Sequence, residues 1–174
     1  MVKTLERSAA RLAAVQALYQ MDVSAKGIDE TLAEFETFWT GEIEGETYHA
    51  AETAFFRDIL TGVLANQRPI DRRIDRTLVE TWPLARVDSV LRAILRAGTY
   101  ELRQRKDVPA KVVIKEYADV AGAFFEREEV GMINAVLDAL AHQLRANEFE
   151  PRRQNSEPEP SDADVSRTNL PKVG

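Results

Sequence analysis

The chain of 174 residues contains no cysteine, only two histidines and no long apolar segment. Without cysteine, neither a disulfide framework nor a thiolate-bound metal site can form. His49 and His142 are too few for a histidine-rich metal site, and the sequence has no glycine-rich phosphate loop and no nucleophile paired with a base. No segment approaches the roughly 18 apolar residues of a membrane span, and the charged start lacks a signal-peptide pattern. We therefore expect a cytoplasmic protein that is not an enzyme and uses no metal or cofactor.

The distribution of charge matters more than its sum. A net charge of −6 argues against a nucleic-acid partner. However, residues 22–58 hold ten acidic and two basic side chains, whereas 59–147 hold fourteen basic and twelve acidic ones. An acidic segment between mildly basic ones permits a local RNA-binding surface on an acidic protein.

Apolar residues recur at helical spacing along most of the chain, and proline and glycine mark the stops. Residues 88–104, for example, place Leu91, Leu95 and Leu102 on one face, with Asp88 as a cap. No alternating run indicates a strand. The pattern predicts an all-α domain of seven helices, at about 4–21, 29–39, 47–66, 69–82, 88–104, 111–124 and 132–144.

The composition changes after residue 147. The segment 148–174 has four of the seven prolines and few large apolar side chains. Such a segment buries too little apolar area to offset the entropy of ordering it. We expect a domain over 1–147 followed by a disordered tail; an acidic appendage that competes with RNA is the functional alternative.

Five stretches of sequence follow one another in a distinctive order. They are AVQALY at 14–19, FFRDILTGV at 55–63, VLRAILRAGTYEL at 90–102, DVPAKVVIKE at 107–116 and INAVLD at 133–138. Each alone is a common amphipathic helix, but the five together at these spacings resemble the NusB family of bacterial antitermination factors. The resemblance covers nearly all of residues 4–145.

The resemblance implies both a fold and a function. It implies two packed helical subdomains, at about 1–66 and 67–147. It also implies a non-enzymatic factor that pairs with the small-subunit ribosomal protein NusE and binds boxA-type single-stranded RNA in nascent ribosomal RNA leaders. With other Nus factors, the pair would act on the elongating RNA polymerase and suppress termination.

The residues of the first helix fit such a role. Lys3, Arg7 and Arg11 stand four apart and would form one cationic stripe, which suits a phosphate backbone. Gln16 could read a base edge, and Tyr19 could stack on a base. Alternatively, the stripe is the solvated face of an amphipathic helix, and Tyr19 belongs to the core.

In two places the chain departs from the family pattern. The first helix is poorer in arginine than in better-known members, so RNA binding by the chain alone should be weak and should improve with NusE. The resemblance also places Glu128 and Met132 on the RNA-facing surface, where a phenylalanine often replaces the methionine. Methionine can pack on a base face, but less specifically.

Other charged and polar patterns have structural interpretations. The arginines at 68, 72, 73 and 76 alternate with Asp71 and Asp75, which favours a solvated, self-paired helix face over the alternative of an RNA-binding patch. Asn134 is predicted to be a buried or half-buried structural amide. The carboxylates at 126, 128 and 129 fit the start of a helix, whose dipole stabilises them.

Two other functions remain open from the sequence. One is an RNA-binding module like the N-terminal domain of ribosomal RNA cytosine methyltransferases, although we expect a disordered tail where the cofactor-binding domain of such an enzyme would begin. The other is a helical scaffold or homodimer that binds RNA weakly or not at all.

Overall fold

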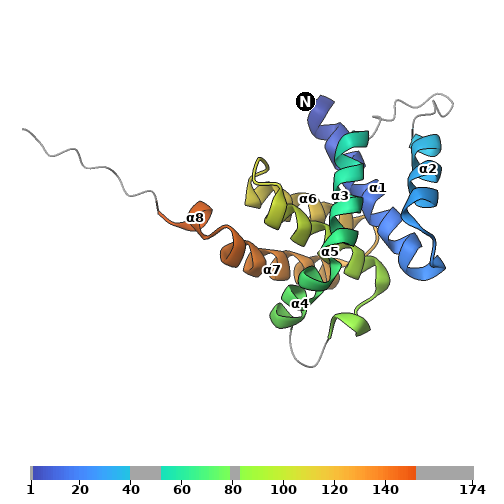
Figure 1. The fold of residues 1–174 in the computed structure, drawn as a ribbon. Helices are drawn as coiled ribbons and strands as arrows, with labels where there is room; N and C mark the ends of the chain where they lie inside the picture. Colours follow the sequence, from blue (N-terminus) through green and yellow to red (C-terminus); the bar gives the residue numbers. More distant parts are fainter. Residues whose placement is uncertain (1, 40–51, 79–82, 152–174) are drawn as a thin grey trace, which may run out of the picture.

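The computed structural model describes residues 2–39, 52–78 and 83–151, apart from the side chains of 2–3 and 37–39 (Figure 1). All regular structure in these ranges is helical. The helices are α1 (Val2–Ser24), α2 (Ile28–Trp39), α3 (Thr53–Ala65), α4 (Gln67–Thr77), α5 (Ser89–Gln104), α6 (Ala110–Gly122), α7 (Arg127–Leu144) and α8 (Ala146–Phe149), with a 3₁₀ turn η1 (Leu84–Arg86) before α5. None of them is long and apolar enough to cross a membrane.

Local sequence signals set several helix ends. The Asp88 side chain accepts a hydrogen bond from the Val90 N–H at 2.8 Å, so the predicted cap of α5 is confirmed. Pro109 stands directly before α6 and cannot lie beyond the first turn of a helix without breaking it, so it separates α5 from α6, as the sequence predicts. At the end of α1, Ala25 adopts a left-handed φ of 55°, and its N–H donates to the Met21 carbonyl.

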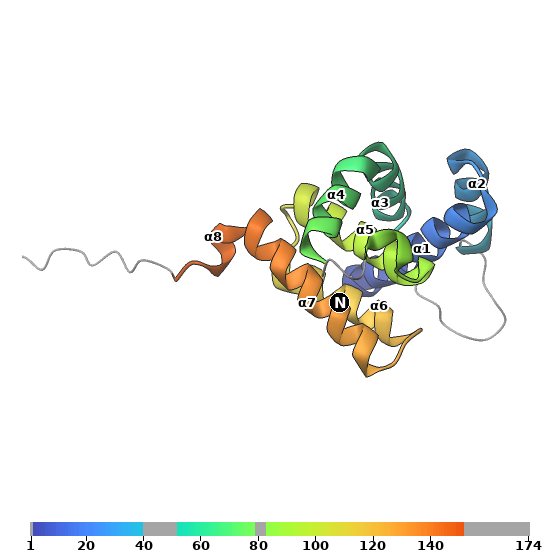
Figure 2. The same cartoon turned by 90° about the horizontal axis from the view of Figure 1, so that it is seen from below.

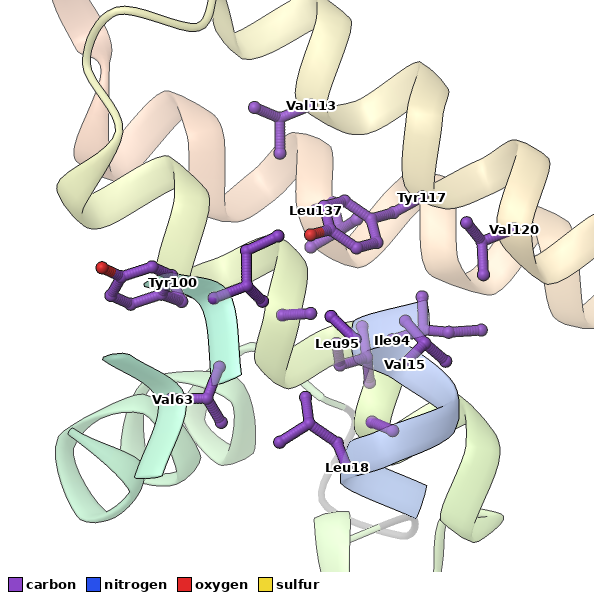
Figure 3. Packing of buried hydrophobic residues seen from close by; sticks show 14 of the residues in the cluster. Val15, Leu18, Val63, Ile94, Leu95, Tyr100, Val113, Tyr117, Val120 and Leu137 are labelled. Carbon is purple, nitrogen blue, oxygen red and sulfur yellow. The ribbon is translucent and has the colours of Figure 1, made fainter. Parts of the chain in front are cut away.

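α5 is the centre of the packing. Eight of its side chains between Leu91 and Leu102 are buried and carry no charge. The helix contacts α1, α3, α4, α6 and α7. Figure 3 shows Leu95 of α5 beside Val15 of α1, with Tyr117 of α6 and Leu137 of α7 on its other side. One apolar cluster therefore runs through the whole domain.

Arg145, near the C-terminal end of the domain, holds the loop between α5 and α6 in place by hydrogen bonds. Arg145, only 2 % exposed, donates hydrogen bonds to the carbonyls of Glu101, Leu102, Arg105 and Val108, at 2.7–3.1 Å. These carbonyls belong to the end of α5 and to the loop; that of Glu101 also accepts from the Arg105 N–H at 2.9 Å, and that of Arg105 from the Val108 N–H at 3.1 Å. A single buried guanidinium therefore fixes the course of the chain from 101 to 108. We call this arrangement the Arg145 clamp.

The all-α prediction is confirmed, and α1 to α7 correspond to the seven predicted helices. α8 is additional, and it crosses the boundary predicted at residue 147. The stretch 47–51 and the tail 152–174 lie outside the described residues. The subdomain division predicted near residue 66 falls between α3 and α4, yet α1 packs against both α3 and α5, so the two halves share the apolar cluster.

Candidate nucleic-acid interface

A hollow of about 240 Å³ lies where the N-terminal part of α1 meets the start of α6. Two of the predicted RNA-binding residues, Arg7 and Arg11, line it. The other lining residues come from α1, the α5–α6 loop and α6: Thr4, Asp107, Val108, Pro109, Val112 and Glu116. The hollow thus combines cationic, anionic and apolar surface, and the Arg145 clamp holds the loop that forms one of its walls.

Arg7 is the more accessible arginine of the hollow. Its side chain is 22 % exposed and donates from Nε to Glu52 at 3.0 Å, with Asp107 at 3.7 Å from a terminal nitrogen. Both pairs are partly open to water, where an ion pair contributes little to stability. A phosphate group could therefore replace a carboxylate as the partner of Arg7.

Arg11 differs from its predicted role. It is 2 % exposed and forms a two-pronged ion pair with Glu101 of α5, at 2.9 and 3.0 Å, while Glu101 itself is fully buried. Burial lowers the pKa of Arg11, but the hydrogen bonds and charge of Glu101 outweigh it and raise that pKa. The prediction of one solvent-facing stripe is wrong for Arg11, because a carboxylate ninety residues away draws it inward. A direct phosphate contact would have to break this pair.

Three arginine side chains at or behind the hollow lie against the ring of Phe55 of α3. The guanidinium carbons of Arg7, Arg11 and Arg105 lie 4.7, 4.9 and 4.9 Å from the centre of its buried ring. The negative face of an aromatic ring attracts such cations. Arg105 is also paired with Asp58 at 3.1 Å. Three arginines are thereby held in place and largely neutralised by neighbouring carboxylates.

The remaining predicted site residues do not line the hollow. On α1, Gln16 is half-buried and Tyr19, with 40 % of its surface exposed, lies further towards the end of the helix. On α7, Glu128 is exposed, whereas Met132 is half-buried and packs against the apolar cluster. Lys3 lies on α1, but its side chain falls outside the described residues.

Sequence reasoning missed most of the hollow's wall. The stretch 107–116 was prominent as a family signature, and Pro109 as a helix stop, but neither indicated that Asp107, Val112 and Glu116 would face α1. Only the packing of α1 on α6 shows this: the Ser8 hydroxyl donates to Glu116 at 2.8 Å. Pairs this distant in sequence leave no local pattern.

Two further predictions are wrong. Asn134 is exposed rather than buried. Three of the four arginines of α4 are solvent-exposed as predicted, but they are not paired with the aspartates of the same helix. Asp71 accepts two hydrogen bonds from Arg96 of α5, at 2.8 and 2.9 Å, and Asp75 accepts one from the Leu84 N–H at 2.8 Å. Tertiary partners, invisible in the local sequence, capture both carboxylates.

Comparison with known proteins agrees with this architecture. The model of the NusB family matches residues 8–142. A relative named transcription antitermination protein NusB, from Rhodopseudomonas palustris strain TIE-1, is 62 % identical over 148 residues, which are 84 % of this chain and 85 % of the relative. A protein of the same name from Bradyrhizobium sp. strain BTAi1 is 60 % identical over 151 residues, covering 86 % and 89 % of the two chains.

Solved structures show the same fold. T. maritima NusB superposes with a TM-score of 0.69 at 31 % identity, covering 83 % of this chain and 97 % of that one. A crystal structure of antitermination factors NusB and NusE in complex with dsRNA gives a TM-score of 0.67 at 21 % identity, covering 79 % and 97 %. The range 8–142 that matches the family model includes every lining residue of the hollow except Thr4 and Arg7. The chain belongs to the NusB family.

Proposed function

We propose that this chain is a transcription antitermination factor that binds boxA-type single-stranded RNA together with NusE. The observation that carries the proposal is its 62 % identity, over most of both chains, to a protein named transcription antitermination protein NusB. The chain would act in the cytoplasm, on the RNA polymerase elongation complex with other Nus factors, and not as an enzyme.

We expect the two arginines of the hollow between α1 and α6 to have different roles in RNA binding. Arg7 would contact a phosphate, because it is partly exposed and its present partners are solvent-accessible carboxylates. Arg11 would instead hold α1 against α5 and so position Arg7 one turn away. Tyr19 offers an exposed ring for stacking on a base further along α1. Lys3, Gln16, Glu128 and Met132 remain proposed contacts.

The electrostatics of the hollow favour a shared RNA site. Asp107 and Glu116 lie in the same walls as the two arginines, so the surface offers little net positive charge to a phosphate backbone. A basic partner beside the hollow would enlarge the positive field without any change in this chain. We therefore expect NusE to raise the affinity for boxA RNA at least about tenfold, which corresponds to about 1.4 kcal/mol.

Titration of labelled boxA RNA with this chain, with and without its own NusE, tests the proposal. The variant Arg7→Gln should weaken RNA binding and reduce its dependence on salt. The matched control is Arg57→Gln, which removes the same charge from α3, where Arg57 is paired with Glu36. A control variant that lost as much affinity as Arg7→Gln would contradict the role of the hollow.

A transcription assay tests the function itself. Readthrough of a terminator downstream of boxA should rise when this chain is added with NusE and the other Nus factors. Sedimentation of the chain, with and without RNA, would reveal the alternative. A stable homodimer that neither binds boxA RNA nor changes readthrough would contradict the proposal and favour the scaffold.

A further inference from the structure

α4 carries a second group of basic side chains, separate from the hollow. We call Arg68, Arg72, Arg73 and Arg76 the α4 arginine face. Three of them are exposed and Arg73 is half-buried, and none has an ion-pair partner in the described part of the chain. This contrasts with Arg7 and Arg11, which are both paired with carboxylates.

The structure explains why these cations lack partners among the described residues. The aspartates that alternate with them in sequence have other partners: Asp71 is held by Arg96, and Asp75 accepts from the backbone of η1. With Asp71 neutralised, Asp75 is the one other carboxylate that α4 itself offers to its four guanidinium groups. A cationic surface therefore persists on a chain whose net charge is −6.

The spacing of the arginines forms a track along the helix. Arg68, Arg72 and Arg76 stand four residues apart, so their α-carbons are about 6 Å apart along the axis and drift slowly around it. Arg73 lies beside this line. In both views α4 lies apart from the N-terminal end of α1, where the hollow is (Figures 1 and 2). The α4 arginine face is thus a distinct surface.

We propose that the α4 arginine face binds the phosphate backbone of single-stranded RNA, as a second contact region beside the hollow. Guanidinium groups suit phosphate because their planar donors bind it in two-pronged fashion. An acidic protein partner fits less well. Protein interfaces are built around apolar anchors, and none of the exposed large hydrophobic residues of the described chain lies on α4.

The contact would be independent of sequence. Phosphate contacts position a nucleic acid but carry no base information, and no aromatic side chain is available on α4 for stacking. The α4 arginine face would therefore hold RNA that flanks a specifically bound segment. This goes beyond the proposed function, because it does not require the hollow to be the boxA site.

The test uses an oligouridylate of about 20 nucleotides, because it lacks boxA. The full chain and the variant Arg72→Gln/Arg76→Gln are titrated over a range of salt. Each lost phosphate contact should reduce the slope of log K against log salt by about 0.7 for a single strand, so the double variant should lose about 1.4. Affinity at low salt should fall at least about tenfold. Glutamine is a good helix former, and circular dichroism should show unchanged helicity.

Matched variants make the result specific. The double variant Lys26→Gln/Arg57→Gln removes the same charge from cations that are paired with Glu34 and Glu36, and should keep the slope. The double variant Arg72→Lys/Arg76→Lys keeps the charge and should also keep the slope. The inference is overturned if the glutamine variant binds like the unmodified chain, or if the lysine variant loses the slope as fully as the glutamine variant.

A third comparison separates RNA from an acidic protein, using polyglutamate as the probe. If the unmodified chain binds polyglutamate through Arg72 and Arg76 but binds oligouridylate without them, the inference is wrong and the partner is an acidic protein. Failure of the proposed function looks different: readthrough and boxA binding would be absent, while the salt slope for oligouridylate would still depend on α4.

Discussion

Replacing Arg11 with methionine should destabilise the fold far more than its position on a basic stripe suggests. Arg11 and Glu101 are both buried and joined by two hydrogen bonds, so the substitution leaves the Glu101 carboxylate without its charge partner in the core. Removing one member of such a pair costs about 3–5 kcal/mol, because the other charge stays desolvated. For a chain of this length, each kcal/mol lowers the Tm by about 2–4 °C.

The double variant Arg11→Met/Glu101→Leu distinguishes this cause from lost packing. Replacing a whole buried pair with apolar side chains is often close to neutral, so the double variant should regain at least about 2 kcal/mol relative to Arg11→Met. The control is Arg57→Met, which breaks the exposed pair with Glu36 and should cost less than about 1 kcal/mol.

Urea unfolding followed by circular dichroism measures these differences as free energies of unfolding. The reasoning would be refuted if Arg11→Met cost no more than Arg57→Met. It would also fail if the effects of Arg11→Met and Glu101→Leu simply added in the double variant, because additivity means that the two side chains do not interact.

Three further substitutions test local features. Ala25→Gly should raise the Tm and stabilise the fold by about 1 kcal/mol, because Ala25 adopts a left-handed φ that glycine tolerates better. Gly62→Ala should cost more than about 2 kcal/mol in urea unfolding, because its β-carbon would lie 2.1 Å from the Tyr100 ring; Gly131→Ala, which meets no atom within 4 Å, is the control and should be neutral or stabilising. Burial and the hydrogen bond to Asp58 raise the pKa of Tyr100 to about 12, so its contribution to stability is complete below about pH 10 and is lost as the pH rises through about 12. Thermal melts should therefore show Tyr100→Phe less stable than the unmodified chain at pH 9, with the difference shrinking towards pH 12; a constant difference would contradict this assignment.

The sequence predicts the helices well because their signals are local. Apolar spacing, Asp88 as a cap and Pro109 as a stop each act within a few residues, and the structure confirms them. The family resemblance rests on the same local stretches. By contrast, the prediction that Lys3, Arg7 and Arg11 form one cationic stripe assumes that all side chains on one face of a helix have the same environment.

That assumption fails where tertiary partners intervene. Arg11 is buried because Glu101 lies across from it on α5, and Asp71 is unavailable to its neighbours because Arg96 holds it from another helix. Both partners are too distant in sequence for a local pattern to indicate them. The candidate site was therefore predicted in part, by Arg7. Its second wall, and the lack of described partners for the arginines of α4, required the three-dimensional arrangement.

The Arg145 clamp affects when, during synthesis of the chain, the hollow can take its final form. The loop that forms one wall of the hollow receives its hydrogen bonds from a residue that follows α7, near the end of the described chain. During synthesis, which proceeds from the N-terminus, α1, α5 and α6 are all made before Arg145 emerges. The hollow is thus among the last parts of the domain to reach its final form. The family match ends at residue 142, so a chain shortened to that length would keep α1 to α6 and all but the last two residues of α7, and would still lack the residue that shapes its candidate binding surface.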